Sequence, residues 1–415
     1  MINLKSQIFS YSLINVLNAS IPFILLPILT TYLSPSDYGT LSLFQLLMLI
    51  STPIILMNTQ GLLTIEYSQL SFTEFQNLVS SIVLISIFGF LFLEVLFFIF
   101  ERYILYYFHV PQEYLYFIPL FILLQAIPII IPIIFQAKKE PINFGKYKIS
   151  MSIVNISLTL LFVLVFSYGW EGRLFGIVGS FGLFTLIGFI ILIKLKLLKL
   201  KICIVSIKKS LAFGVPLIPH SIAGVFLIMS DRVFLVNMLS ESSVGIYSVA
   251  FQISSVVTIL FGSINQAWAP NLFEKLNQNP SMIEKKEIVK TTYKIMLLMF
   301  GITVISLFVL PYIFDIFIDE SYSEGKYIMD YIIIAFLFQG FYYMVTNYIF
   351  YSKKTHLLSY ITFSTLIIVF ISNFILIGLY GIIGAAYTMI IIWILFFFVT
   401  WLVSNRVYPM PWRLK

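Results

Sequence analysis

The chain of 415 residues has few of the groups on which metal sites and soluble domains depend. Its single cysteine, Cys203, excludes an intramolecular disulfide and a thiolate metal cluster. Its three histidines, His109, His220 and His356, are scattered without a metal-binding spacing. Charged residues make up only 10% of the chain, whereas soluble domains have about 25%. The sequence therefore predicts no metal site and argues against a water-soluble fold.

Motifs for nucleotide and hydrolase chemistry are also absent from the sequence. It contains no Walker loop, no nucleophile elbow and no dinucleotide fingerprint. The longest connection on the predicted external side, about residues 101–113, is shorter than the long external loop that membrane polymerases and ligases typically carry. We therefore expect a chain that is not an enzyme and does not hydrolyse ATP.

Apolar sequence dominates the chain, of which 60% is hydrophobic. A spanning helix needs about 20 apolar residues, because the hydrocarbon layer is roughly 30 Å thick and each helical residue rises about 1.5 Å. The uniformly apolar runs exclude barrel strands, which alternate over about ten residues. The sequence thus predicts an all-α integral membrane protein with about twelve transmembrane helices. The predicted spans are residues 8–32, 40–64, 77–100, 114–136, 147–168, 173–194, 211–237, 244–268, 291–318, 326–352, 357–378 and 381–404.

The distribution of Lys and Arg predicts the orientation of these spans. Of the 25 basic residues, only Arg102, Arg173 and Lys326 fall on one side, and Arg232 lies within a span. All the others share a side with the two termini, and such an excess marks the cytoplasmic side. We therefore expect both termini in the cytoplasm. The formal charge of +7 then reflects topology and contact with membrane lipids, with no nucleic acid as partner.

An internal repeat divides the chain into halves. Three pairs of segments recur in the same order: residues 33–42 with 239–248, 135–139 with 350–354, and 176–179 with 381–384. The first pair is offset by 206 positions and lies between the first and second helix of each half. Because six helices is an even number, the copies share an orientation and are related by a pseudo-twofold axis along the membrane normal. We expect one six-helix bundle in residues 1–200 and another in residues 201–415.

Three segments give the chain a family resemblance. They are Tyr-Leu-Ser-Pro-Ser-Asp-Tyr-Gly at 32–39 (with Pro22 and Pro27 before it), Ser-Asp-Arg-Val-Phe-Leu at 230–235 and Gly-Ile-Tyr-Ser at 245–248. These segments resemble the polysaccharide transporter branch of the multidrug/oligosaccharidyl-lipid/polysaccharide (MOP) exporter superfamily, and Wzx-type O-antigen flippases in particular. The resemblance implies a MATE-like fold, with two bundles around a cavity that opens to one side of the membrane at a time.

The function that this resemblance implies is lipid flipping. A Wzx-type flippase moves an undecaprenyl-pyrophosphate-linked oligosaccharide from the cytoplasmic to the periplasmic leaflet of the bacterial inner membrane. Its partners would include a polysaccharide polymerase and a chain-length regulator. Two alternatives stay open: a cation-coupled small-molecule exporter of the same superfamily and, with less support, a membrane polymerase or ligase.

Charged residues within the predicted spans are the first candidates for a site. Arg232 is the one basic residue well inside a span, and a guanidinium can bind phosphate oxygens in a forked geometry. The alternative is that Arg232 snorkels to the interface or pairs with an acidic neighbour. Asp231 is adjacent but points about 100° away, so we do not expect it to be that partner. Asp231 and His220 are eleven residues apart on nearly the same face, which makes them candidates for a proton or sodium relay, although packing with one hydrogen bond is the more common role of such a pair. Glu94 is a further candidate for titration during transport.

Amide side chains within the spans form the second group of candidates. They either line the sugar path or hydrogen-bond between helices, and the sequence does not distinguish these two interpretations. Gln60 aligns with Gln266 at the offset of 206. The candidate substrate contacts are Asn15, Asn18, Asn58, Gln60, Gln252 and Gln266. Four glycines of the sixth span, at 172, 176, 179 and 182, predict close helix packing instead of a phosphate loop.

Overall fold

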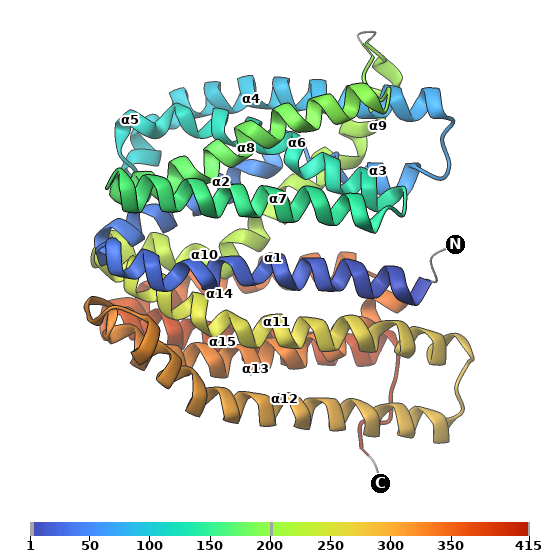
Figure 1. Ribbon diagram of the computed structural model, residues 1–415. Coiled ribbons are helices and arrows are strands. Elements are labelled where there is room, and N and C mark those ends of the chain that lie inside the picture. Colours follow the sequence, from blue (N-terminus) through green and yellow to red (C-terminus); the bar gives the residue numbers. More distant parts are fainter. Residues whose placement is uncertain (1–3, 200–201, 414–415) are drawn as a thin grey trace. The chain divides into compact units, whose positions relative to one another are not determined.

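The computed structural model describes residues 4–199 and 202–413, and almost all of them lie in helices (Figure 1). In this part of the chain, 11 helices are long and apolar enough to cross a membrane. A shorter apolar stretch, Leu17–Tyr32, lies within the first helix. The predicted all-α membrane fold is therefore confirmed.

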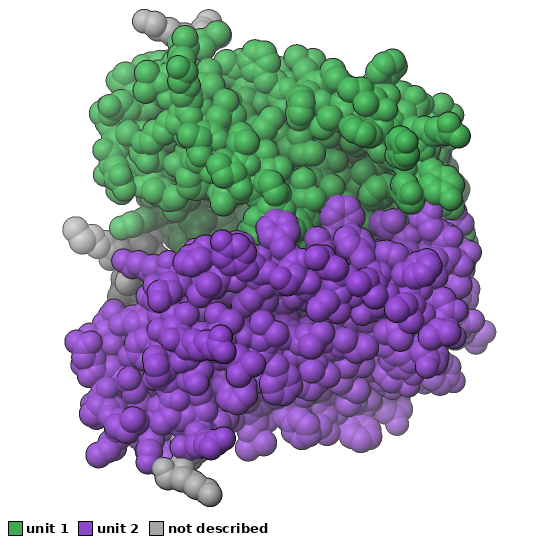
Figure 2. Space-filling view, turned by 180° about the vertical axis from the view of Figure 1, so that it is seen from behind, with its two compact units in different colours: residues 1–225 green, residues 226–415 purple. Residues whose placement is uncertain are grey.

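Two compact units make up the chain, residues 1–225 and 226–415 (Figure 2). Unit 1 contains α1 (Leu4–Tyr32), α2 (Pro35–Leu56), α3 (Gly61–Glu66), α4 (Phe72–Phe108), α5 (Gln112–Leu115), α6 (Phe117–Ala137), α7 (Pro141–Leu160), α8 (Gly169–Lys194) and α9 (Ile204–Gly214). The helix α10 (Ile218–Met238) crosses the boundary. Unit 2 continues with α11 (Glu241–Asn277), α12 (Met282–Phe317), α13 (Glu324–Tyr351), α14 (His356–Tyr380) and α15 (Ile382–Val407). Three short helical segments, η1 (Leu161–Val165), η2 (Val215–Leu217) and η3 (Glu320–Tyr322), complete the secondary structure of the described residues.

The expected boundary between residues 200 and 201 falls outside the described residues and stays a prediction. By contact, α9 belongs to unit 1: Lys209 Nζ lies 2.6 Å from Glu66 Oε2, and Gly214 is in close contact with the backbone of Met57. The assignment of six spans to each bundle stays a prediction.

Helix caps occupy equivalent positions in the two repeats. Ser34 begins α2 with a capping box, in which its Oγ accepts a hydrogen bond from the Asp37 N–H at 3.2 Å and Asp37 Oδ2 accepts one from the Ser34 N–H at 3.1 Å. Ser240 begins α11, where its Oγ accepts from the Ser243 N–H at 3.2 Å. Since Ser34 and Ser240 are separated by 206 positions, the repeat seen in the sequence marks the same helix start in each half.

Two of the predicted continuous spans are interrupted. The expected span over residues 40–64 ends as α2 at Leu56, because Met57 and Asn58 adopt left-handed backbone angles with φ of 47° and 49°. The expected span over residues 211–237 contains a 3₁₀ segment between α9 and α10, where Pro216 and Pro219 each lack the N–H that a helix interior requires. The second and seventh predicted spans are therefore broken helices.

Glycine permits the close approach of the backbone at the first break. A Cβ on Gly214 would lie 1.9 Å from the Met57 carbonyl oxygen, and one on Gly89 would lie 2.3 Å from the Ile55 carbonyl oxygen. Both approaches are shorter than any side chain permits. Glycines at these two positions thus hold α4 and α9 against the end of α2.

The glycines of α8 pack closely on α7, as the sequence suggests. A Cβ on Gly176 would lie 2.3 Å from Thr159 Oγ1, and one on Gly172 would lie 2.9 Å from the Phe162 carbonyl carbon. α7 is followed by the π-helical segment η1. Ser167 in the connection and Gly169, the first residue of α8, then adopt φ of 56° and 58°. In Figure 1, α7 and α8 can be followed as two adjacent green helices of unit 1.

Candidate functional site

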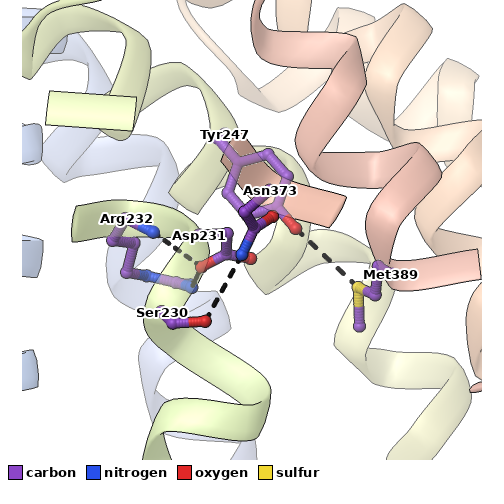
Figure 3. Close-up of polar contacts among 6 residues, drawn as sticks. All are labelled: Ser230, Asp231, Arg232, Tyr247, Asn373 and Met389. Atoms are coloured by element: carbon purple, nitrogen blue, oxygen red, sulfur yellow. Dashed lines mark hydrogen bonds and ion pairs between the residues drawn. The ribbon is translucent and has the colours of Figure 1, made fainter. Parts of the chain in front are cut away.

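A buried ion pair lies on α10 in unit 2 (Figure 3). Arg232 Nη1 donates to Asp231 Oδ1 at 2.9 Å, and the Arg232 backbone N–H donates to the same oxygen at 2.8 Å. The two residues are only 3% and 6% exposed. The expectation that Asp231 and Arg232 do not pair is therefore wrong. Neighbouring Cβ atoms do diverge by about 100°, but the long arginine side chain folds back across that angle.

Aromatic rings enclose the cation of this pair. The guanidinium carbon of Arg232 lies 4.8 Å from the ring centroid of Phe251 and 5.7 Å from that of Tyr247. The Tyr247 hydroxyl donates to Met389 Sδ at 3.8 Å. Such rings stabilise a cation through their quadrupoles and exclude water from it. Arg232 therefore does not snorkel to the interface. Its guanidinium is paired with Asp231 and packs against the rings of Phe251 and Tyr247, all within unit 2.

A small cavity, lined mostly by apolar side chains, adjoins Asp231. Its volume is about 20 Å³, enough for about one water molecule or a small cation, and its lining includes Ser230, Asp231, Asn373 and Thr388. Asn373 Nδ2 donates to Ser230 Oγ at 3.4 Å. The oxygens Asn373 Oδ1 and Thr388 Oγ1 are buried without a hydrogen-bond partner in the described part of the chain. Oxygen atoms of this kind fit a proton-carrying water or Na⁺. Among the described residues, no cluster of three or more His, Cys, Asp or Glu could hold a metal ion.

The predicted relay between His220 and Asp231 is not formed as a direct contact. His220 is exposed near the start of α10, and no hydrogen bond joins it to Asp231 in the described structure. Eleven helical residues span roughly 16 Å, so a proton would need intervening waters to pass between the two side chains. Glu94 is half-buried in α4 and forms no hydrogen bond or ion pair with another described residue. The coupling roles of these three residues stay predictions.

A second polar region runs along α7 in unit 1. Lys148 Nζ donates to Asn15 Oδ1 of α1 at 3.2 Å, and the Ser152 hydroxyl donates to Asn18 Oδ1 of the same helix. Asn15 and Asn18 therefore make the interhelical hydrogen bonds that the sequence leaves open. Their contact with sugar stays a prediction.

Arg173 extends this polar region to α8. Its Nη1 donates to Asn155 Oδ1 at 2.6 Å and to Thr159 Oγ1 at 2.8 Å, and Asn155 Nδ2 donates to Ser180 Oγ at 3.2 Å. Neither Arg173 nor Lys148 forms an ion pair with any carboxylate in the described residues. We call Lys148, Ser152, Asn155, Thr159 and Arg173 the cationic stripe.

The cationic stripe was not evident from the sequence. Arg173 was expected on the external side and Lys148 on the cytoplasmic side, because each lies near the end of a predicted span. The structure places Arg173 in the second turn of α8 and Lys148 in the third turn of α7. The available signal was the polar spacing 148, 152, 155 and 159, which returns to one helix face every three or four residues.

The remaining amides lie at several places. Asn58, which the sequence places inside a helix, lies in the break after α2, and its Nδ2 donates to Ser221 Oγ of α10 at 3.0 Å. Gln60 lies in the same break, and its Oε1 is buried without a partner in the described part. Gln252 is half-buried and Gln266 is exposed on α11. Backbone that leaves the helix at membrane depth commonly lines a polar path, so the break at Asn58 and Gln60 is a further candidate region.

The chain is similar to known families of membrane proteins. The model of a family described as polysaccharide biosynthesis protein matches residues 4–275, and the MatE model matches residues 216–375. An uncharacterized membrane protein of Haemophilus influenzae is 26% identical over 233 residues, which cover 54% of this chain and 56% of the relative. Lsg locus putative protein 1 of the same organism is 30% identical over 153 residues, covering 36% of this chain and 37% of the relative. The matched regions thus span about half or less of these curated relatives.

Solved structures resemble the chain along nearly its whole length. An inward-facing multidrug resistance MATE family transporter of the MOP superfamily superposes with a TM-score of 0.73 at 12% identity, covering 94% of each chain. A MATE protein in complex with MaD3S superposes with a TM-score of 0.64 at 12% identity, covering 97% of this chain and 96% of the other. At such low identity the similarity concerns the fold alone, and it confirms the predicted MATE-like architecture.

Proposed function

Because the chain belongs to the polysaccharide biosynthesis protein family, within the MOP superfamily, we propose that it is a flippase for a lipid-linked oligosaccharide. Its substrate would be an undecaprenyl-pyrophosphate-linked repeat unit, such as that of an O-antigen, which passes from the cytoplasmic to the periplasmic leaflet of the bacterial inner membrane. Alternating access between two bundles would carry the head group across. The Lys and Arg distribution supports cytoplasmic termini.

The observation that carries this proposal is the cationic stripe. Ionisable groups are costly inside a membrane segment and commonly serve a substrate or ion. Lys148 and Arg173 are held there by amides and hydroxyls, with no carboxylate of the described residues to neutralise them. A net positive region of this kind complements a pyrophosphate, while the amides and hydroxyls match sugar hydroxyls.

Arg173 is the proposed contact for the pyrophosphate, in preference to Arg232. A guanidinium has five N–H donors, and the hydrogen bonds of Arg173 to described residues use only Nη1. Its remaining donors suit phosphate oxygens. Arg232 is already paired with Asp231 at 2.9 Å, so it would bind a phosphate only after that pair opens.

Asp231 is the proposed coupling group. Binding of a proton or Na⁺ at Asp231, next to the cavity of about 20 Å³, would cancel its attraction for Arg232 and release the arginine. The chemical step is thus the gain of one cation by one carboxylate, with no ATP. A polysaccharide polymerase and a chain-length regulator are the proposed protein partners downstream.

Small-molecule export is the second candidate function, and two observations favour it. The MatE model matches residues 216–375. Elsewhere in unit 2, the ring centroid of Tyr342 lies 4.8 Å from that of Phe396 and 5.9 Å from that of Trp393, and such aromatic clusters suit apolar cations.

A reconstituted transport assay tests the proposal. Full-length protein in proteoliposomes would be supplied with a fluorescent undecaprenyl-pyrophosphate oligosaccharide, and quenching by a membrane-impermeant reductant would report its leaflet. We expect Arg173→Ala to abolish flipping and Arg173→Lys to retain part of it, since Lys keeps the charge but loses the fork. Arg102→Ala is the matched control, because Arg102 is exposed at the same predicted side.

Two results would count against the flippase. One is wild-type flipping by Arg173→Ala, which would remove the cationic stripe from the substrate path. The other is efflux of a cationic dye by a protein that flips no lipid-linked sugar, which would favour the exporter. In cells, loss of the gene should leave lipid-linked repeat units on the cytoplasmic leaflet.

A further inference from the structure

A groove of about 600 Å³ opens on unit 1 among α6, α7 and α8. Its polar end carries Lys138, Asn143, Lys146 and Lys194. These residues lie where α6 ends, α7 begins and α8 ends. All three helix ends face the side on which Lys and Arg are concentrated, which is the predicted cytoplasmic side.

The charges of this groove are unbalanced. Glu140 is its one acidic residue, and Lys138 Nζ lies 3.0 Å from Glu140 Oε1. Burial raises the pKa of the Glu140 carboxyl, but hydrogen bonds from Asn143 and Lys138 outweigh it and hold the pKa below its usual value. Glu140 therefore neutralises Lys138. Lys146 and Lys194 are exposed, and neither forms an ion pair or hydrogen bond with another described residue.

The rest of the groove is mostly apolar and follows the axis of α8. Phe184, Ile187 and Ile191 line it at spacings of three and four residues, so they share one helix face that ends at Lys194. Ten helical residues separate Phe184 from Lys194, a distance of roughly 15 Å. An apolar channel of this length, with a cationic end, matches an acyl chain below an anionic head group.

Two lining residues of the groove join α7 to α8. The Tyr147 hydroxyl donates to the Phe184 carbonyl oxygen at 2.7 Å, and the two rings pack edge to face with centroids 5.1 Å apart. Both side chains are buried. The groove is thus preformed between α7 and α8, so that a ligand would not need to order its walls.

From these features we infer that the groove binds an anionic phospholipid of the cytoplasmic leaflet. The preferred lipid carries two phosphates, one for Lys146 and one for Lys194, and places an acyl chain along Ile187 and Ile191. Basic pockets between transmembrane helices commonly bind such head groups. This site is separate from the cationic stripe and does not depend on the transported substrate.

Lipid binding to the purified full-length protein tests the inference. Native mass spectrometry or a fluorescence titration in detergent would compare tetraoleoyl cardiolipin, which carries two phosphates, with dioleoyl phosphatidylcholine. Each lysine near an anionic head group contributes about fivefold in affinity, so Lys146→Gln with Lys194→Gln should weaken cardiolipin binding by roughly 25-fold. The control pair, Lys353→Gln with Lys354→Gln, lies at the equivalent turn of the second repeat and should leave binding unchanged.

A second variant separates the groove from general surface charge. Ile187→Trp fills the apolar channel while keeping every lysine, and it should also weaken cardiolipin binding. Equal binding of phosphatidylcholine, equal loss in the control pair, or no effect of Ile187→Trp would overturn the inference. Displacement of cardiolipin by equimolar undecaprenyl pyrophosphate would likewise overturn it, since the groove would then prefer the substrate carrier to a phospholipid.

Discussion

Removing Asp231 should destabilise unit 2 through the charge that is left behind. At 2.9 Å, and with an effective dielectric constant of about 20, the attraction between Asp231 and Arg232 is about 6 kcal/mol before desolvation is counted. Removing one partner of a buried pair typically costs about 3–5 kcal/mol, because the other charge remains buried. Phe251 and Tyr247 would stabilise the unpaired Arg232 only in part, since a desolvated cation–π contact contributes about 2 kcal/mol.

The assay is thermal unfolding in detergent, followed by intrinsic fluorescence or size-exclusion chromatography. We expect Asp231→Ala to lower the Tm by on the order of 10 °C. The double variant Asp231→Leu with Arg232→Met removes both charges and should recover most of the wild-type Tm, because an apolar pair of similar volume is often neutral or stabilising. If Asp231 couples transport, this stable double variant should still be inactive.

Two outcomes would refute this reasoning. An unchanged Tm in Asp231→Ala would show that Arg232 is not held by the carboxylate. A double variant as unstable as the single one would show that the pair is not the source of the loss, and wild-type transport by the double variant would remove Asp231 from the coupling step.

Two further predictions concern the backbone of the fold. Gly214→Ala should reduce the yield of folded protein by more than tenfold in size-exclusion chromatography, because its Cβ would lie 1.9 Å from the Met57 carbonyl oxygen. The control, Gly224→Ala, should behave as wild type, because its Cβ would meet nothing within 4 Å. Equal yields of the two variants would contradict the close approach of Gly214 to Met57. Ser34→Ala and Ser240→Ala should each destabilise the protein by about 1 kcal/mol through loss of an N-cap, so both should lower the Tm by a similar amount. A lower Tm in only one of the two variants would argue against equivalent caps in the two repeats.

The overall architecture was predictable because length and hydropathy alone determine a membrane span. Eleven long apolar helices, together with the stretch Leu17–Tyr32, correspond to the twelve predicted spans. The repeat was predictable for a different reason: the caps at Ser34 and Ser240 leave a signature of small polar residues that apolar sequence does not obscure. These features are local, so one sequence is enough to find them.

The details of the site depended on contacts that a single sequence does not display. Asparagine tolerates a left-handed angle, as at Asn58, but methionine rarely adopts one, so the break that begins at Met57 could not be foreseen. The packing of Gly214 against that backbone accompanies the break. Arg173 looked like a loop residue until its bonds to Asn155 and Thr159 showed it held against α7. Helix geometry predicts where a Cβ points, but not how far a long side chain turns back.

The neutrality of the pair on α10 has a consequence for the response to membrane voltage. An element that carries Asp231 and Arg232 together bears no net charge and can move in the electric field without electrical work. Once a cation binds at Asp231, the same element carries one elementary charge, which is worth about 2.3 kcal/mol for every 100 mV crossed. Transport should then accelerate when an inside-negative potential is imposed on the vesicles. Asp231→Asn should lose that acceleration, because the element then carries the Arg232 charge in both directions and its return moves against the field. A wild-type rate indifferent to the potential would mean that the loaded pair does not cross the field.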